Sequence, residues 1–186
     1  MTFTVTKYGN PVLRKKAEPI AEVTDEIRKL ADDMLETMYA EHGLGLAAEQ
    51  IGKSAAICVI DVPADADVDA NGDRENPDVE MPLVLINPKI TEESDMIVTS
   101  QEGCLSFPGI YSNVGRFEEV TVKFQDRNAT WVELRVKGLL ARAVQHELDH
   151  LDGVLLADRM SPVKKVALSG KLKKLAKQTK RELQKL

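Results

Sequence analysis

The residues with the clearest chemical potential form one short segment, His146-Glu147-Leu148-Asp149-His150. If this segment is helical, the i and i+4 spacing puts both imidazoles on one face, where they can hold a single metal ion. The intervening glutamate is then placed to act on a metal-bound water. Two of the chain's three histidines belong to the pattern. This favours a metal site over a chance pair of surface histidines.

Two imidazoles leave such a site one protein ligand short, because catalytic metal sites usually have three protein ligands and an open position. Zinc proteases with the extended pattern H-E-x-x-H-x-x-G-x-x-H take a third histidine, but this chain has Leu156 there. The residues alone leave His42, Cys58, Cys104 and Asp158 as candidates. Apolar neighbours favour a packed core thiol for Cys58. Cys104 instead lies in a turn framed by glycine and proline, which would expose its thiolate to a metal.

A third segment, GLGLAAEQIG at residues 43–52, superficially matches the dinucleotide-binding fingerprint. That interpretation fails because the fingerprint needs a strand before its glycines, and a helix is expected here. The paired glycines instead favour extended backbone that another group approaches closely. From composition alone, the amide of Gln50 is expected to bond only within its loop.

Taken together, the three segments resemble the three signature motifs of the peptide deformylase family. The first motif is similar to residues 43–50, the second to residues 102–106 and the third to residues 145–153. Their order and separations also fit, and the resemblance extends over roughly Tyr8 to Arg159. Three motifs in register are far more specific than H-E-x-x-H alone.

The resemblance implies a metal-dependent hydrolase that removes the N-formyl group from the formylmethionine of newly made polypeptides and releases formate. Cys104, His146 and His150 would bind the metal, which would be ferrous iron (Fe2+), with Zn2+ or Ni2+ as substitutes. Metal-bound water would attack the formyl carbon. Glu147 would take its proton and later pass one to the leaving amine.

The same resemblance implies an oxyanion hole that contains the Leu105 backbone N–H and the Gln50 side-chain amide. This role replaces the simple loop contact expected for Gln50. The formyl oxygen gains negative charge as its carbon becomes tetrahedral, and these two donors would stabilise it.

The substrate backbone would lie as an added strand against Leu44-Gly45 and the segment before Cys104, which includes Gly103. The methionine side chain would enter an apolar pocket lined by Leu139 and Ala143. Formyl-methionyl nascent peptides are therefore the expected partner.

The chain departs from the family pattern at Arg142, beside the expected methionine pocket, where the family tends to be apolar. It also departs at Glu49, where the first motif commonly has proline, and in a long acidic segment before Pro82. Neither of these last two departures touches a group assigned to catalysis. Glu102 and Arg116 are expected to form an ion pair beneath the second motif.

Hydrophobic periodicity predicts the elements that position these residues. Apolar residues spaced i, i+3, i+4 and i+7 between residues 27 and 38 predict a helix with Thr24 or Asp25 as its cap, ending near His42-Gly43 with glycine as the stop. Residues 56–60 and 83–86 predict buried strands, the second ended by Asn87-Pro88. Alternation in residues 120–124 and 131–136 predicts a hairpin. A second helix, from Gly138 to about Gly153, carries the histidine motif.

Strands precede and separate the helices without a βαβ rhythm, so we expect an α+β fold. It would consist of mixed or antiparallel sheets packed around a central metal-binding helix, followed by a basic C-terminal helix. Residues 1–162 would form a single catalytic domain and residues 163–186 a helical extension. The leucine pattern of this extension, which includes Leu186, is interrupted at Ser169-Gly170.

Charge is unevenly distributed along the 186 residues, whose net charge is −5. Residues 163–186 contain nine basic residues and one acidic residue, so this tail carries +8 and the rest of the chain −13. The acidic, non-periodic residues 61–80 are expected to form a solvated loop. The charge of the body and the 4% aromatic content argue against a nucleic-acid-binding surface and a DNA partner.

The expected location is the cytoplasm. Two cysteines cannot form a disulfide framework, and they suit a reducing compartment. No apolar run approaches the roughly 20 residues that a membrane span needs, and the N-terminus resembles neither a signal nor a transit peptide.

Two other functions compete with the deformylase. A zinc metallopeptidase that cuts internal bonds is disfavoured by Leu156 and by the motif around Cys104. A non-catalytic, metal-stabilised module that binds the ribosome or RNA draws support from the basic tail, because lysines and arginines on a helix bind phosphates. A deformylase could use the same tail to dock on the ribosome.

Overall fold

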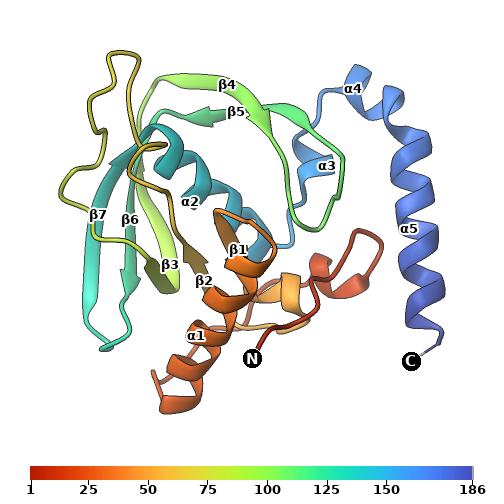
Figure 1. Ribbon diagram of the computed structural model, residues 1–186, viewed down its shortest axis with the longest axis horizontal. Coiled ribbons are helices and arrows are strands. Elements are labelled where there is room, and N and C mark those ends of the chain that lie inside the picture. The colour runs from red at the N-terminus through yellow and green to blue at the C-terminus, as the bar shows by residue number, and fades with distance from the viewer. Residues whose placement is uncertain (186) are drawn as a thin grey trace.

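The computed structural model describes residues 1–185. One helix, α2 (Gly138–Leu151), packs against both a five-stranded and a two-stranded sheet, as Figure 1 shows. All strand pairs in both sheets are antiparallel. The expected α+β fold is confirmed, and its sheets are antiparallel rather than mixed.

The larger sheet has the strand order β1-β2-β3-β6-β7. Its second strand is buried on both faces, as its uninterrupted apolar run predicts. Its last two strands form the predicted hairpin. The five strands are β1 (Gly45–Ala47), β2 (Ile57–Ile60), β3 (Leu83–Glu93), β6 (Glu119–Gln125) and β7 (Trp131–Lys137).

Strand β3 does not end at Asn87-Pro88, so the predicted strand end was wrong. Asn87 has a φ of 51°, and the register with β6 shifts between Ile86 and Lys89. The side chain of Asn87 accepts a hydrogen bond from the Ile20 N–H and donates one to the Ile20 carbonyl, both at 2.8 Å. A β-bulge therefore absorbs the proline, and β3 continues along β6.

The smaller sheet consists of β4 (Ile97–Glu102) and β5 (Ser112–Phe117), neither of which was predicted. Five of the six residues of β4 are exposed, so the strand has no alternating buried face that a sequence pattern could reveal. Since β4 pairs with β5 only, its other edge is free of strand partners among the described residues.

Helix α1 (Asp25–Ala40) begins after its predicted cap, whose Thr24 hydroxyl accepts the Ile27 N–H at 3.4 Å. Its end differs from the prediction. His42, with a φ of 57°, takes the left-handed position expected of glycine, and the N–H of Gly43 bonds to the Met38 carbonyl at 2.9 Å. A glycine is needed at 43 for another reason: a Cβ there would lie 2.8 Å from Leu105 Cδ1.

The acidic residues 61–80 form a loop whose side chains are mostly exposed, as expected, but Val62 and two polar residues, Asp67 and Asn76, are buried. The Asp67 carboxylate accepts from the Asn76 side chain at 2.6 Å and from Arg74 at 3.1 Å. Asn76 in turn accepts the Lys137 N–H at 3.0 Å and donates to the Lys137 carbonyl at 3.1 Å. The loop is therefore anchored at the start of α2.

The C-terminal chain leaves the sheets and runs along the N-terminal segment (Figure 1). Leu172 and Thr179 are buried, and the apolar side of the last helix packs near Gly9. The C-terminal helices α4 (Pro162–Ala167) and α5 (Ser169–Leu183) are separated just before Ser169, where the sequence predicts an interruption, and Leu186 lies outside the described residues.

The remaining helices are η1 (Pro11–Arg14), η2 (Ala48–Ile51) and α3 (Leu156–Arg159).

Among residues 1–185, no helix combines the length and the apolar character needed to cross a bilayer.

Gly9 provides a test of how α5 is held. Its φ is 105°, and a Cβ would lie 2.7 Å from the Ala176 Cα, so Gly9→Ala is expected to lower the free energy of unfolding by about 1–3 kcal/mol. Gly72→Ala is the matched control, because Gly72 also has a positive φ of 89° but no atom within 4 Å of a Cβ. Urea denaturation measures both. Equal losses in the two variants would show that the contact with α5 contributes nothing.

Candidate metal centre and active site

Cys104, His146 and His150 come together from two elements. The histidines lie one turn apart on α2, and Cys104 lies in the turn after β4. One ligand atom from each residue lies within 4.8 Å of the others, and Cys104 Sγ is 3.2 Å from His150 Nε2. Within residues 1–185 this is the cluster of three potential ligands that the fold assembles.

The other ligand candidates lie elsewhere. Cys58 is fully buried in β2, where burial raises the pKa of its thiol well above the usual value. Asp158 pairs with Arg14. His42 is exposed at the rim of the cavity, and Leu156 is buried in the apolar core.

The charge of the centre suits a metal. Burial alone would raise the pKa of Cys104, but the two imidazoles outweigh it and hold the pKa well below the usual thiol value. For His146, burial would lower the pKa, but hydrogen bonds to Cys104 and Glu102 hold it well above the usual imidazole value. A thiolate and two imidazoles directed at one point form a donor set for a divalent transition metal.

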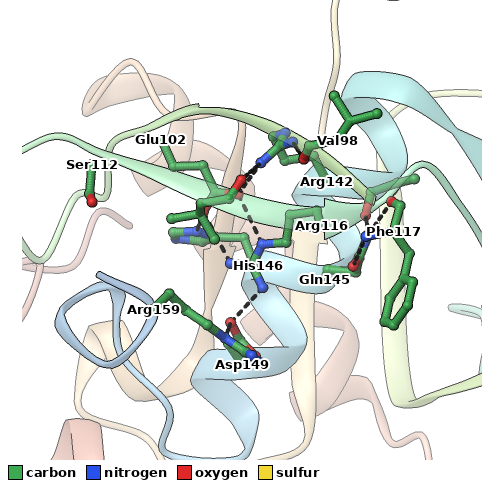
Figure 2. A network of polar contacts seen from close by, with 12 residues as sticks. Val98, Glu102, Ser112, Arg116, Phe117, Arg142, Gln145, His146, Asp149 and Arg159 are labelled. Carbon is green, nitrogen blue, oxygen red and sulfur yellow. Dashed lines mark hydrogen bonds and ion pairs between the residues drawn. The ribbon is translucent and has the colours of Figure 1, made fainter. Parts of the chain in front are cut away.

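Glu102 holds His146 in place. Its carboxylate accepts from Arg116 Nε at 2.9 Å and from Arg142 Nη1 at 2.8 Å, and it lies 3.0 Å from His146 Nδ1 (Figure 2). Burial would raise the pKa of Glu102, but hydrogen bonds from His146 and Arg116 lower it strongly. The expected Glu102–Arg116 ion pair is thus confirmed. The contact with Nδ1 leaves the other ring nitrogen of His146 for the centre.

The same network continues to the surface. Arg116 Nη1 donates to Asp149 at 2.6 Å, and Asp149 accepts from Arg159 Nε at 2.9 Å (Figure 2). Arg116 is buried, whereas the side chain of Arg159 is about half exposed. Charged contacts therefore connect the solvent with His146, a candidate metal ligand.

Glu147 lies between the two histidines in sequence, and its side chain is only 4% exposed. Burial raises its pKa to about 7, although the nearby imidazoles act in the opposite direction. Its carboxylate lies against β1, where a Cβ on Gly45 would be 2.3 Å from Glu147 Oε1. The close approach expected at the paired glycines is thus made by Glu147.

Gln50 lies in η2 with its amide turned to the centre. Its Oε1 accepts the Ala47 N–H at 2.9 Å, which fixes the orientation of the amide. Its Nε2 then donates to Ser106 Oγ at 3.3 Å and approaches Cys104 Sγ at 3.6 Å. Gln50 therefore bonds within its own segment, as composition suggests, and also directs a donor toward the metal cluster.

A cavity of about 570 Å³ opens over these groups. Its wall joins the glycine-rich segment around β1, the turn after β4 and one face of α2. All of the expected substrate-binding and oxyanion residues line it, namely Leu44, Gly45, Gln50, Gly103, Leu105, Leu139 and Ala143. Since β1 pairs only with β2 and β4 only with β5, both strands keep one edge free of strand partners in residues 1–185.

Sequence reasoning did not foresee the contacts of three residues of this region. Arg142 bonds to Glu102 and to the carbonyls of Val114 and Val98, at 2.9 and 2.6 Å. Lys7 donates to the Leu105 carbonyl at 2.9 Å. The position of Arg142 one turn before His146 was a usable signal, whereas nothing near Lys7 in the sequence indicated its contact.

The third of these residues, Glu49, is completely buried next to Gln50, and both of its carboxyl oxygens lack a hydrogen-bond partner. Burial raises its pKa to about 7. Its departure from the family pattern marked the position in the sequence, but not its location beside the centre.

Comparison with known proteins agrees with this geometry. A family model described as polypeptide deformylase matches residues 2–166. A peptide deformylase of Thermodesulfovibrio yellowstonii is 45% identical over 169 residues, which cover 91% of this chain and 95% of the relative. One from Endomicrobium trichonymphae is 43% identical over 173 residues, which cover 93% and 95%. These matches do not support a peptidase of internal bonds or a non-catalytic module.

A solved structure gives the same result. The crystal structure of peptide deformylase from Thermotoga maritima superposes with a TM-score of 0.76 at 38% sequence identity, and the match covers 87% of this chain and 99% of that one.

The Glu102 network predicts a large effect of a small change. Glu102→Gln leaves Arg116 and Arg142 buried without a full countercharge, so it is expected to lower the free energy of unfolding by about 3–5 kcal/mol. Asp158→Asn, at a largely exposed pair with Arg14, is the matched control and should cost at most about 1 kcal/mol. Urea denaturation compares them. Similar values for both variants would contradict a central role of Glu102.

Proposed function

The chain belongs to the polypeptide deformylase family, enzymes that remove the N-formyl group from nascent peptides, and we propose that the centre of Cys104, His146 and His150 is where this chain does so. The observation that carries the proposal is a buried glutamate, Glu147, beside three convergent ligand atoms on the wall of one cavity.

The metal of this site is proposed to be Fe2+, with Zn2+ or Ni2+ as substitutes, held by Cys104, His146 and His150. The thiolate character of Cys104 and the held ring of His146 support a divalent transition metal at these three residues, and the choice of Fe2+ follows the resemblance to the family. When bound, a divalent metal supplies a Lewis acid that lowers the pKa of water and polarises a carbonyl oxygen.

Glu147 moves the protons. Its carboxylate accepts a proton from the attacking water and returns it to the amine that leaves as the formyl C–N bond breaks. Because burial raises its pKa to about 7, both protonation states are accessible near neutral pH. Water has only limited access to this carboxylate, which lies between Gly45 and the floor of the cavity.

Two donors are proposed to stabilise the formyl oxygen as it gains charge: the backbone N–H of Leu105 and Nε2 of Gln50. Gln50 is preorganised, because its Oε1 is held by the Ala47 N–H. The contact from Lys7 to the Leu105 carbonyl holds the adjoining peptide of the turn.

The substrate is proposed to lie between the free edges of β1 and β4, with its backbone paired to Leu44-Gly45 on one side and to Gly103 on the other. Its methionine side chain would then enter the part of the cavity lined by Leu139 and Ala143. Both residues are apolar and lie on α2, next to the metal-binding turn.

The catalytic domain is proposed to comprise residues 1–162, and residues 163–186 an extension that docks on the ribosome, where nascent peptides emerge. All nine basic residues of this tail are exposed, and within residues 1–185 none of them forms an ion pair with a carboxylate. The cytoplasm, where bacterial-type ribosomes make formylated chains, is the proposed location.

Formate release tests the function. Anaerobically prepared, iron-loaded protein is expected to release formate from a formyl-methionyl tripeptide and to leave casein uncut. Glu147→Ala should keep its metal and lower kcat by about 10²- to 10⁴-fold, because the general acid and base is gone. Cys104→Ala should instead lose metal affinity, as measured by metal content after dialysis.

The exposed Glu133→Ala on β7 is the control and should behave like the parent protein. Absence of formate from metal-loaded protein, or equal activity on casein, would refute the deformylase assignment. Full activity of Glu147→Ala would refute the role of Glu147 alone.

Ribosome docking is tested by charge. One variant carries four substitutions that leave the packed side of α5 unchanged: Lys173→Gln, Lys174→Gln, Lys177→Gln and Lys180→Gln. It is expected to bind ribosomes about tenfold or more weakly at low salt, and its binding should depend less steeply on salt. The matched control replaces four exposed lysines elsewhere in the chain by glutamine: Lys15, Lys53, Lys89 and Lys137. Sedimentation with purified ribosomes measures both. Equal binding of the two variants would exclude docking through the tail.

A further inference from the structure

Unpartnered polar atoms gather around the proposed centre. Across residues 1–185, the buried side-chain nitrogens and oxygens without a hydrogen-bond partner are both carboxyl oxygens of Glu49, Oε2 of Glu147 and Nδ1 of His150. Such atoms are costly to bury and rare in folded proteins. The proposed proton transfer accounts for the unpartnered Oε2 of Glu147. It does not account for the two carboxyl oxygens of Glu49 or for Nδ1 of His150.

Glu49 lies on an element, η2, that packs against α2, the helix of His150. The next residue, Gln50, approaches Cys104 Sγ at 3.6 Å, and the same sulfur is 3.2 Å from His150 Nε2. Burial dominates the raised pKa of Glu49, but the imidazole of His150 acts on it in the opposite direction. The carboxyl group is therefore within electrostatic range of that ring.

The two histidines of the centre differ in the contacts of their Nδ1 atoms. Nδ1 of His146 lies 3.0 Å from a carboxylate oxygen of Glu102. His150 turns Nε2 toward Cys104, so its Nδ1 carries the ring proton when Nε2 binds a metal. Metal-binding histidines almost always donate this N–H to a carboxylate, a carbonyl or water. Among residues 1–185, the buried acceptors without a partner are Oε2 of Glu147, which the proposed proton transfer uses, and the two oxygens of Glu49.

We propose that Glu49 is a positioning residue that accepts a hydrogen bond from Nδ1–H of His150 in the metal-loaded protein, as Glu102 does for His146. The bond fixes the tautomer and the ring angle of His150. This inference rests on the proposed metal centre.

Cobalt(II) is a suitable probe, because its absorption reports both the thiolate bond and the ligand geometry. Glu49→Leu removes every acceptor and is expected to weaken Co2+ binding by about 10- to 100-fold and to shift the visible bands. Glu49→Gln keeps an acceptor oxygen and should restore both the affinity and the spectrum. A chelator competition measures the affinity.

Thr37→Val is the matched control, since it removes a buried polar group from α1 outside the centre and should leave Co2+ affinity unchanged. Thermal unfolding of the metal-free variants checks the fold, and Glu49→Met replaces Glu49→Leu if the latter does not fold. Unchanged affinity and spectrum in the apolar variant would overturn the positioning role. An equal loss in Glu49→Gln would also overturn it.

The two proposals fail in different ways. If the parent protein shows no thiolate-to-cobalt band, or if Cys104→Ala binds Co2+ equally well, the metal centre itself is wrong. If the parent binds Co2+ through its thiolate and Glu49→Leu does the same with equal affinity, only the role of Glu49 is wrong.

Discussion

The carboxylate of Glu102 is buried among β4, β5 and α2, and it stays charged because Arg116 and Arg142 donate to it from two of these elements. Removing such a charge from water is costly unless several donors surround it. The donors in turn fix where the two-stranded sheet sits on α2. The same carboxylate holds Nδ1 of His146, so the packing of the sheets and the orientation of a ligand depend on one group.

Close packing supplies the other constraint on the site. Gly45 has no side chain, and its backbone therefore lies directly against the carboxylate of Glu147. The edge of β1 and the Glu147 carboxylate therefore cannot move independently of each other. The three side chains of the cluster converge on one point, because the thiolate of Cys104 and the imidazoles attract one another in a buried setting.

Local patterns were sufficient for the elements with a buried face. Helix α1, the two core strands and the β6–β7 hairpin follow from periodicity and turn residues, because burial on one face imposes a period. The β4–β5 sheet lacks that period, since β4 is exposed, and it was not predicted. Two details were predicted wrongly: His42 instead of Gly43 takes the left-handed position after α1, and β3 continues past Asn87, whose positive φ is held by contacts with Ile20 and Gln125.

The sequence by itself determined the pairing of His146 and His150 and the place of Glu147 between them, since helix geometry fixes side chains four residues apart. It left the third ligand open until the motifs were compared with a known family. The tertiary structure brings Cys104 to the histidines, as the family motifs imply, and it alone decided that Arg142 shares Glu102 and that Glu49 is buried. These are contacts between residues distant in the chain, and their energy depends on burial and on neighbouring charges, which no local pattern encodes.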